Sequence, residues 1–149
     1  MTEATLAHLK ADLRRAEGVK QFPYDDGRGN LTIGIGHNLT ANGLDVPTID
    51  GILERDVRKV ISEIDSELSW VWTLDEIRQA AIIELCFNLG MEKFQKFRNT
   101  INRLQTGLYD RAANILADSL WAHQVDDGVG GKFGRADRIC HMIRTGTYI

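Results

Sequence analysis

The 149-residue chain has few residues of the kinds that build disulfide frameworks, metal centres or membrane spans. Its two cysteines, Cys86 and Cys140, lie in apolar, helix-like stretches, as buried free thiols do in proteins that fold in a reducing compartment. Their spacing leaves a disulfide open. No cluster of His and Cys has metal-ligand spacing, so we expect no zinc site. No apolar run approaches the ~20 residues that cross a bilayer, so we expect no membrane anchor.

An excess of positive charge is also lacking. The chain has 18 Lys and Arg against 21 Asp and Glu, a net charge of −3, which argues against a nucleic-acid-binding protein. Residues 1–87 carry 9 basic and 15 acidic side chains (net −6), and residues 88–149 carry 9 and 6 (net +3). The cationic C-terminal part suits an anionic polymer, although an ordinary solvated surface explains it equally well.

Ordinary proportions of hydrophobic residues (43%) and charged residues (26%) indicate a folded globular chain. The first fifteen residues are polar and interrupted by charges, unlike a signal peptide, so we expect the protein to fold in the cytoplasm. Neither an internal repeat nor a low-complexity segment is present. The length favours one domain, or two lobes that share one core.

Hydrophobic periodicity and turn residues predict an α+β chain that is mostly α. A β-like stretch at 21–37 is broken by a strong turn signal at 27–30. The sequence Thr73-Leu74-Asp75-Glu76 has the form of a capping box, so we expect a buried helix to begin there and to end at Gly90. The other expected elements are helices at about 3–17, 48–68, 92–106, 109–123 and 135–145, and a glycine-containing loop at 126–134.

Two carboxyl groups near the N-terminus have environments suited to acid–base chemistry. Glu17 ends the first predicted helix, where the negative end of the helix dipole and partial burial raise a carboxyl pKa. Asp26 lies in the predicted turn, where exposure keeps it ionised. One protonated and one ionised carboxyl are the usual pair for glycoside hydrolysis. Such residues are common in non-catalytic settings, and chemistry alone does not choose between Asp26 and Asp25.

Strand alternation assigns faces to the segment that follows the turn. Leu31, Ile33 and Ile35 are predicted to face the core. Thr32 shares the opposite face with two glycines, one of them Gly36, and that face is therefore expected to be open to a bulky ligand.

The spacing of Glu17, Asp26 nine residues later and Thr32 six further on closely resembles the catalytic signature of the T-even bacteriophage lysozymes, glycoside hydrolase family 24. Spacing also selects Asp26 over Asp25. The resemblance covers most of the chain. The segments that carry it are Glu17-Gly18, Tyr24-Asp25-Asp26, Thr32-Ile33-Gly34-Ile35-Gly36-His37, Arg78-Gln79-Ala80-Ala81-Ile82-Ile83, Phe87-Asn88-Leu89-Gly90, Ala112-Ala113, Ser119-Leu120-Trp121, Arg135-Ala136 and Arg144-Thr145-Gly146-Thr147.

The resemblance implies a lysozyme-like two-lobe fold over residues 1–149. An N-terminal lobe at about 18–47 contains a small β-hairpin region, and the first helix packs on the C-terminal lobe. A connecting helix at about 48–68 leads to a helical C-terminal lobe at about 69–149. The implied reaction is hydrolysis of the β-1,4 bond between N-acetylmuramic acid and N-acetylglucosamine in peptidoglycan glycan strands, without a cofactor.

By the same resemblance, Glu17 is the general acid, and Asp26 and Thr32 position and activate water. The positions of Phe87, Thr100 and Gly36 would contact the glycan. Arg135 matches an arginine that pairs with the catalytic glutamate, which would lower the pKa of that carboxyl and oppose the helix-end effect. For His37 a structural role outweighs a catalytic one.

The sequence departs from the family at two subsite positions, where Asn38 and Ile115 replace a leucine and an asparagine. The implied biology is a monomeric endolysin that stays in the host cytoplasm until a separate route releases it to the wall and the host lyses. Two alternatives stay open. A lytic transglycosylase needs mainly the acid, and a non-catalytic wall-binding module would use the same fold.

Overall fold

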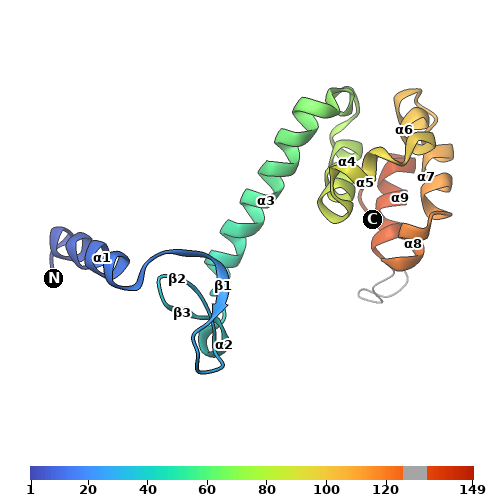
Figure 1. The fold of residues 1–149 in the computed structure, drawn as a ribbon. Coiled ribbons are helices and arrows are strands. Elements are labelled where there is room, and N and C mark those ends of the chain that lie inside the picture. Colours follow the sequence, from blue (N-terminus) through green and yellow to red (C-terminus); the bar gives the residue numbers. More distant parts are fainter. Residues whose placement is uncertain (126–133) are drawn as a thin grey trace. The chain divides into compact units, whose positions relative to one another are not determined.

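The computed structural model describes residues 1–125 and 134–149 (Figure 1). These residues form two compact units, Met1–Ile52 and Leu53–Ile149. The expected fold class is confirmed, because the described chain is mostly helical with a small antiparallel sheet near the N-terminus. The predicted loop at 126–134 lies outside the described residues except for Gly134, which precedes the last helix.

The N-terminal unit consists of short elements that are fixed by caps and turns. Helix α1 begins after Thr2, whose hydroxyl oxygen accepts a hydrogen bond from the Thr5 N–H (3.2 Å), and it ends before Gly18. A three-stranded antiparallel sheet of order β1-β2-β3 follows. The elements are α1 (Glu3–Glu17), β1 (Lys20–Asp25), β2 (Leu31–Gly34), β3 (His37–Asn38) and α2 (Leu39–Asn42).

Helix α3 (Val46–Glu67) matches the long helix expected at 48–68. Asp45 caps its first turn by accepting the Thr48 N–H (3.1 Å). The side chain of Thr48 is the main cause of a lowered pKa of the Asp45 carboxyl, followed by the Thr48 N–H. The apolar stripe of the helix is buried only in its second half, at Val60 and Ile64. Ile49 and Leu53, in the first half, are 48% and 49% exposed.

The C-terminal unit is built around helix α4, as its apolar sequence predicts. Ala81, Ile82 and Leu85 of α4 are completely buried, and Ile139 and Ile143 of α9 are buried with them. Phe87 is the apolar exception on α4, at 44% exposed. The elements are η1 (Ser69–Thr73, a 3-10 helix), α4 (Glu76–Leu89), α5 (Met91–Gln95), α6 (Arg98–Gln105), α7 (Tyr109–Ala117), α8 (Leu120–Gln124) and α9 (Arg135–Thr145).

The capping residue of α4 was predicted wrongly. Asp75, and not Thr73, accepts the N–H of Arg78 (3.1 Å), and this pairing begins the helix. The Thr73 hydroxyl donates instead to the Trp70 carbonyl (2.7 Å), which closes the 3-10 turn before α4. The helix therefore starts two residues later than a Thr73 cap would place it.

Each of the two helices expected at 92–106 and 109–123 is in fact a pair. The first breaks after Gln95 and resumes at Arg98, and the second breaks after Ala117 and resumes at Leu120. The second break has a clear local cause, because the Ser119 hydroxyl caps α8 by accepting the Ala122 N–H (3.3 Å).

The predicted faces of β2 are also wrong. Thr32 is only 4% exposed, whereas Leu31, which alternation assigned to the core, is 48% exposed. The register explains this, because Thr32 lies on the central strand between Tyr24 of β1 and Asn38 of β3, whereas Leu31 pairs with Asp25 beside the turn. Cross-strand neighbours cover the threonine, and no apolar layer covers the leucine.

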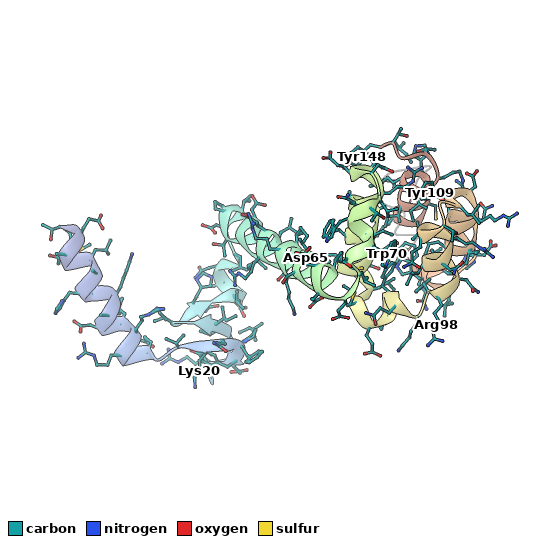
Figure 2. All side chains as sticks on the ribbon, turned by 90° about the horizontal axis from the view of Figure 1, so that it is seen from above. Lys20, Asp65, Trp70, Arg98, Tyr109 and Tyr148 are labelled. Atoms are coloured by element: carbon teal, nitrogen blue, oxygen red, sulfur yellow. The ribbon has the colours of Figure 1, made fainter. Side chains whose placement is uncertain are left out.

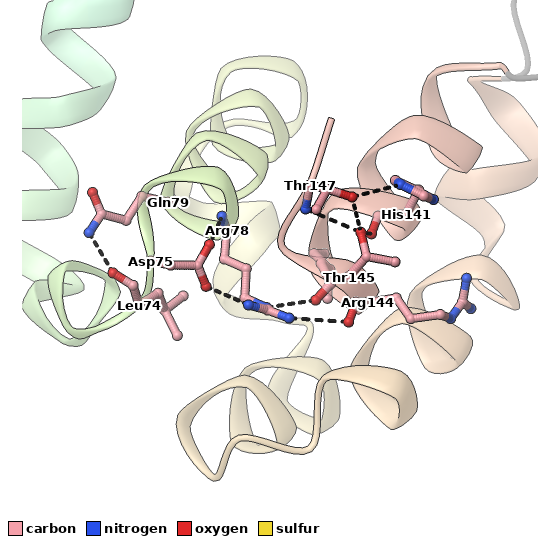
Figure 3. A network of polar contacts seen from close by, with 9 residues as sticks. Leu74, Asp75, Arg78, Gln79, His141, Arg144, Thr145 and Thr147 are labelled. Atoms are coloured by element: carbon pink, nitrogen blue, oxygen red, sulfur yellow. Dashed lines mark hydrogen bonds and ion pairs between the residues drawn. The ribbon is translucent and has the colours of Figure 1, made fainter. Parts of the chain in front are cut away.

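Arg78 links the start of α4 to the end of α9 (Figure 3). Its guanidinium donates to the carbonyls of Ile143 (2.8 Å) and Arg144 (3.1 Å), pairs with Asp75, and lies 3.8 Å from the centre of the Tyr109 ring. Carbonyls at a helix end lack partners in the helix, and a cation is favoured there. Two of the segments that carry the family resemblance, 66 residues apart, therefore meet at one arginine.

Gly146 permits this contact. It has a positive φ of 68°, and a β-carbon at this position would lie 2.6 Å from Nη1 of Arg78. Glycine is required here both by backbone conformation and by space.

Candidate active site

Asp26 is held in the β1–β2 turn by three hydrogen bonds. Its Oδ1 accepts the N–H groups of Arg28 (2.8 Å) and Asn30 (3.1 Å), and its Oδ2 accepts the Asn30 side-chain amide (2.9 Å). The amide of Asn30 is the largest cause of a pKa below the usual range for this carboxyl, followed by the two backbone N–H groups. Asp26 is therefore ionised at neutral pH, as its place in the turn predicts.

Asp25 and Asp26 differ in their surroundings. Asp25 accepts one backbone hydrogen bond, from the Gly27 N–H (2.7 Å), while Asp26 accepts three. A carboxylate has about four lone-pair positions, so Asp26 keeps one that is free to accept a hydrogen bond from water. The structure thus separates two neighbours that the chemistry of the sequence left equivalent.

The register of the hairpin assigns Asp26 and Thr32 to one face of the sheet. Tyr24 pairs with Thr32, and the Asp26 N–H extends the ladder by donating to the Asn30 carbonyl (3.1 Å). Because side chains alternate along a strand and cross-strand partners share a face, Asp26, Asn30 and Thr32 lie on the same side. The Thr32 hydroxyl on that face forms no hydrogen bond with the part of the chain that the structure describes.

Glu17 is the last residue of α1, and its side chain is exposed. Its Oε2 lies 3.7 Å from the position that a β-carbon on Gly36 would occupy. Gly36 is in the β2–β3 turn with a positive φ of 72°, so any side chain there would be strained and would contact the carboxyl group of Glu17. The carboxyl of Glu17 thus lies beside the turn that ends β2.

His37 forms a hydrogen bond within the N-terminal unit. Its Nε2 donates to the carbonyl of Gly43 (2.6 Å), which fixes the tautomer and ties β3 to the residue that follows α2. Glu17, Asp26, Thr32, Gly36 and His37 all belong to the N-terminal unit.

Phe87 and Arg135 lie in the C-terminal unit, at a pocket of about 470 Å³. Arg135 Nε is 3.8 Å from Oε1 of Glu84 on α4. Also on α4, the side-chain carbonyl of Asn88 accepts a hydrogen bond from the Trp121 indole (2.8 Å). Apolar residues dominate the lining. The lining residues are Leu53, Val57, Ala80, Ile83, Glu84, Phe87, Asn88 and Arg135.

Thr100 belongs to a second pocket of the C-terminal unit, of about 390 Å³. The residue is 1% exposed, and its Oγ1 is buried without a hydrogen-bond partner in the described chain. Ile115, which stands where the family has an asparagine, lines the same pocket.

Asn30 is the residue of this site that sequence reasoning missed. It closes the turn and is the main cause of the low pKa of Asp26. The signal that could have found it is the presence of Asp and Asn at the two ends of a glycine-containing turn, since both side chains readily bond to nearby backbone.

Within residues 1–125 and 134–149, no group of three or more His, Cys, Asp and Glu side chains could hold a metal ion. In the same residues no helix combines the length and the apolar character of a membrane span. Cys86 and Cys140 are buried free thiols, and burial raises their pKa values to about 12 and about 11.

A small antiparallel sheet, followed by a long helix and a helical unit, defines a mostly helical α+β protein, and comparison with known proteins identifies the family. The profile of the phage lysozyme family matches residues 14–135. Two similar relatives are the probable T4-type lysozymes 1 and 2 of Dictyostelium discoideum, at 26% and 28% identity, with 95% of this chain and 96% of each relative covered. The pre-baseplate central spike protein Gp5 of Enterobacteria phage T4 is 26% identical over 90% of this chain but only 27% of its own length.

The chain belongs to the phage lysozyme family, and it is a glycoside hydrolase of the lysozyme type. The expected resemblance is therefore confirmed.

Proposed function

We propose that this lysozyme cleaves the β-1,4 bond between N-acetylmuramic acid and N-acetylglucosamine in peptidoglycan through Glu17, Asp26 and Thr32. The observation that carries the proposal is the set of three hydrogen bonds that the Asp26 carboxyl accepts on the sheet face that it shares with Thr32. These hydrogen bonds lower the pKa of Asp26 and so favour its ionised form. A carboxylate that stays ionised can accept a proton from a water molecule and so activate it, but it cannot serve as a proton donor. That division leaves Glu17 as the proton donor.

In this mechanism the carboxyl group of Glu17 protonates the oxygen of the leaving sugar as the glycosidic bond breaks. A water molecule donates a hydrogen bond to the free lone pair of Asp26 and attacks the anomeric carbon. The Thr32 hydroxyl, which has no partner among the described residues, supplies a second contact that places this water. The proton lost by the water passes to Asp26.

The two neighbouring aspartates provide a matched test of this mechanism. Asp26→Asn is expected to lower the rate of release of reducing ends from purified peptidoglycan by about 10²–10⁴-fold. Asp25→Asn is expected to stay within about threefold of the wild type, because Asp25 accepts only one turn hydrogen bond. Equal losses in the two variants would contradict the assignment of Asp26.

Glu17→Gln tests the proton donor, with circular dichroism of the same sample as a check on folding. We expect activity to fall by at least the same factor while the thermal midpoint is unchanged, because Glu17 is exposed. Wild-type activity in this variant would exclude the mechanism. The products also distinguish hydrolysis from the transglycosylase alternative, since hydrolysis adds one water to the mass, and an anhydro product would favour the alternative.

Phe87 and Thr100 are proposed to contact the glycan from the C-terminal unit. The exposed ring of Phe87 at the rim of an apolar pocket offers a surface for the C–H face of a sugar. Phe87→Leu should raise KM and change kcat little, because it removes a contact that is equally present before and during the reaction. The pairing of Arg135 with the catalytic glutamate stays a prediction, and within its own unit Arg135 lies beside Glu84.

We further infer that the enzyme is a monomeric endolysin that lyses its host from the cytoplasm after a separate route opens the inner membrane. Its membership of the phage lysozyme family supports this role. Expression in a host cell should leave the culture turbid until the membrane is permeabilised with chloroform, and should then clear it. Clearing without that step would contradict the need for a separate route.

A further inference from the structure

The tip of the β1–β2 turn carries an arginine, Arg28, directly beside the proposed water-activating carboxylate. Its backbone is held by that carboxylate, because the Arg28 N–H donates to Oδ1 of Asp26 (2.8 Å). The residues on either side, Gly27 and Gly29, have positive φ angles of 78° and 81°, which glycine adopts freely. Neither glycine has a side chain that could cover the arginine, so the turn presents Arg28 to solvent next to Asp26.

The guanidinium of Arg28 has no carboxylate partner. The residue is exposed, and its side chain forms neither an ion pair nor a hydrogen bond within the part of the chain that the structure describes. The neighbouring carboxylate of Asp25 accepts the Gly27 N–H (2.7 Å) instead. No other lysine or arginine occurs between residues 21 and 54. A turn that holds two aspartates therefore also holds one unpaired cation, which is available to an external anion.

The charge of Arg28 acts on the carboxyl group of Asp26. The Asn30 side-chain amide is the main cause of the low pKa of Asp26, and the positive charge of Arg28 is a further, smaller cause. Attraction between exposed charges is largely screened beyond about 10 Å at moderate salt, so the guanidinium lies in the neighbourhood of this carboxylate. An anion bound by Arg28 would therefore lie beside the group that is proposed to activate water.

The proposed substrate carries an anionic group close to the bond that is cleaved. Water attacks the anomeric carbon of N-acetylmuramic acid, and the lactyl ether that carries the wall peptide is attached to the same sugar ring. The peptide has free carboxylates. N-acetylglucosamine has a hydroxyl in place of this ether, so the lactyl peptide is what distinguishes the two sugars of the glycan. A cation beside Asp26 is therefore in a position to recognise the peptide-bearing sugar.

We propose that Arg28 is a specificity-determining residue, whose guanidinium binds a carboxylate of the peptide on the muramic acid at which water attacks. The identity of the ligand rests on the proposed function, whereas the unpaired cation beside Asp26 is a feature of the turn itself. A guanidinium binds a carboxylate through two parallel hydrogen bonds, and Arg28 has no existing ion pair to give up. Bound in this way, the peptide places the muramic acid ring, and not the N-acetylglucosamine ring, next to Asp26.

The first test compares three substrates that differ in the charge of the peptide. They are purified peptidoglycan, the same material with its peptide carboxyls converted to amides, and glycan strands freed of peptide by an amidase. Release of reducing ends gives kcat and KM for each. For Arg28→Gln we expect KM for the free-acid substrate to rise about three- to tenfold with kcat within about twofold, because a binding contact is lost. The other two substrates should show no change in KM.

Lys20→Gln is the matched control for general charge. Lys20, labelled in Figure 2, is exposed on β1 and pairs with Gly34 at the end of the sheet opposite to the turn. This variant removes the same charge from the same sheet and should leave KM unchanged for all three substrates. Arg28→Lys keeps the charge but loses the planar fork, and it should recover part of the binding. A rise in KM that is equal for the three substrates, or that Lys20→Gln reproduces, would overturn the proposal.

A second test measures binding without turnover, so that it is independent of the proposed reaction. N-acetylmuramoyl-L-alanyl-D-glutamate is titrated into the full chain, and the side-chain Nε–H signal of Arg28 is followed by nuclear magnetic resonance. We expect a saturable shift with the free acid and at least about fivefold weaker binding of its diamide.

Inorganic phosphate is titrated in parallel to distinguish the source of the anion. Tighter binding of phosphate than of the peptide acid would overturn the assignment to the peptide, and saturation by neither compound would overturn the site. Failure of the proposed function has a different signature, because wild-type activity in Glu17→Gln would leave the Arg28 titration unchanged.

Discussion

The two units bury their apolar side chains to very different extents. None of the apolar residues in 1–52 is buried, and Leu9, Phe22 and Leu31 are 45%, 79% and 48% exposed. In residues 53–149 every helix contributes at least one residue to a common core. The N-terminal unit is instead held by caps, a sheet ladder and turn hydrogen bonds such as those of Asp26.

The buried apolar residues that stabilise the protein and the residues proposed for catalysis therefore lie in different units. The proposed acid, the proposed water-activating carboxylate and Thr32 all lie in the unit that lacks a core. Polar substitutions in that unit are therefore expected to change activity with little change in stability. Apolar substitutions in the C-terminal unit should change stability first.

The largest expected effect is loss of a core side chain. Leu85→Ala in α4 should lower the free energy of unfolding by about 2–5 kcal/mol, because Leu85 is completely buried and its truncation leaves a cavity. Leu31→Ala is the matched control in the N-terminal unit and should cost at most about 0.5 kcal/mol. Urea denaturation followed by circular dichroism measures both. Comparable losses of unfolding free energy in the two variants would contradict the difference in core burial between the two units.

Gly146→Ala should have the next largest effect. A β-carbon there collides with the Arg78 guanidinium and forces an alanine into a positive φ, at a cost of about 1–3 kcal/mol. The thermal midpoint should fall, and the catalytic pH profile should keep its shape. A midpoint equal to that of the wild type would show that Arg78 moves aside freely.

Asn30→Ala tests whether a polar substitution in the N-terminal unit changes the pH dependence of activity. Removal of the side-chain amide removes the main cause of the low pKa of Asp26, so this pKa should rise toward the usual value. A lowered pKa keeps the carboxylate ionised until the pH falls through that value. The acidic limb of the pH–activity profile should therefore move to higher pH in the variant, and Asp25→Asn, the control, should leave it in place.

The smallest effect is expected at the two thiols. Burial raises the pKa values of Cys86 and Cys140 to about 12 and about 11, so neither thiolate is populated at pH 8. An alkylating reagent should leave the native protein unmodified, as judged by mass spectrometry, and should modify both thiols in denaturant. Rapid labelling of the native protein would show that the core of the C-terminal unit opens easily.

Local signals in the sequence predicted the parts of the fold that depend on local physics. The helix expected at 3–17 was found at Glu3–Glu17, and the one expected at 135–145 at Arg135–Thr145. Each ends before a glycine, Gly18 or Gly146, where a glycine cap competes well with further helix. The turn at 27–30 was predicted from its own residues, because glycine and asparagine favour turns.

The errors arose where side chains compete for the same backbone group, or where neighbours distant in sequence decide burial. Thr73 and Asp75 can both cap α4, and the structure shows that Asp75 does so. Alternation correctly split β2 into two faces, but the choice of the covered face depends on Tyr24 and Asn38 across the sheet. The roles of Asn30 and Arg78 also depend on contacts that periodicity does not contain.

The contact between Arg78 and the end of α9 has a consequence for the speed of folding. It joins positions 65 and 66 residues apart, and a long loop must close before it can form. A contact of this kind tends to form late on the folding route, after the transition state. Loss of the guanidinium in Arg78→Met should therefore accelerate unfolding much more than it slows refolding, so the arginine sets how long a folded molecule lasts.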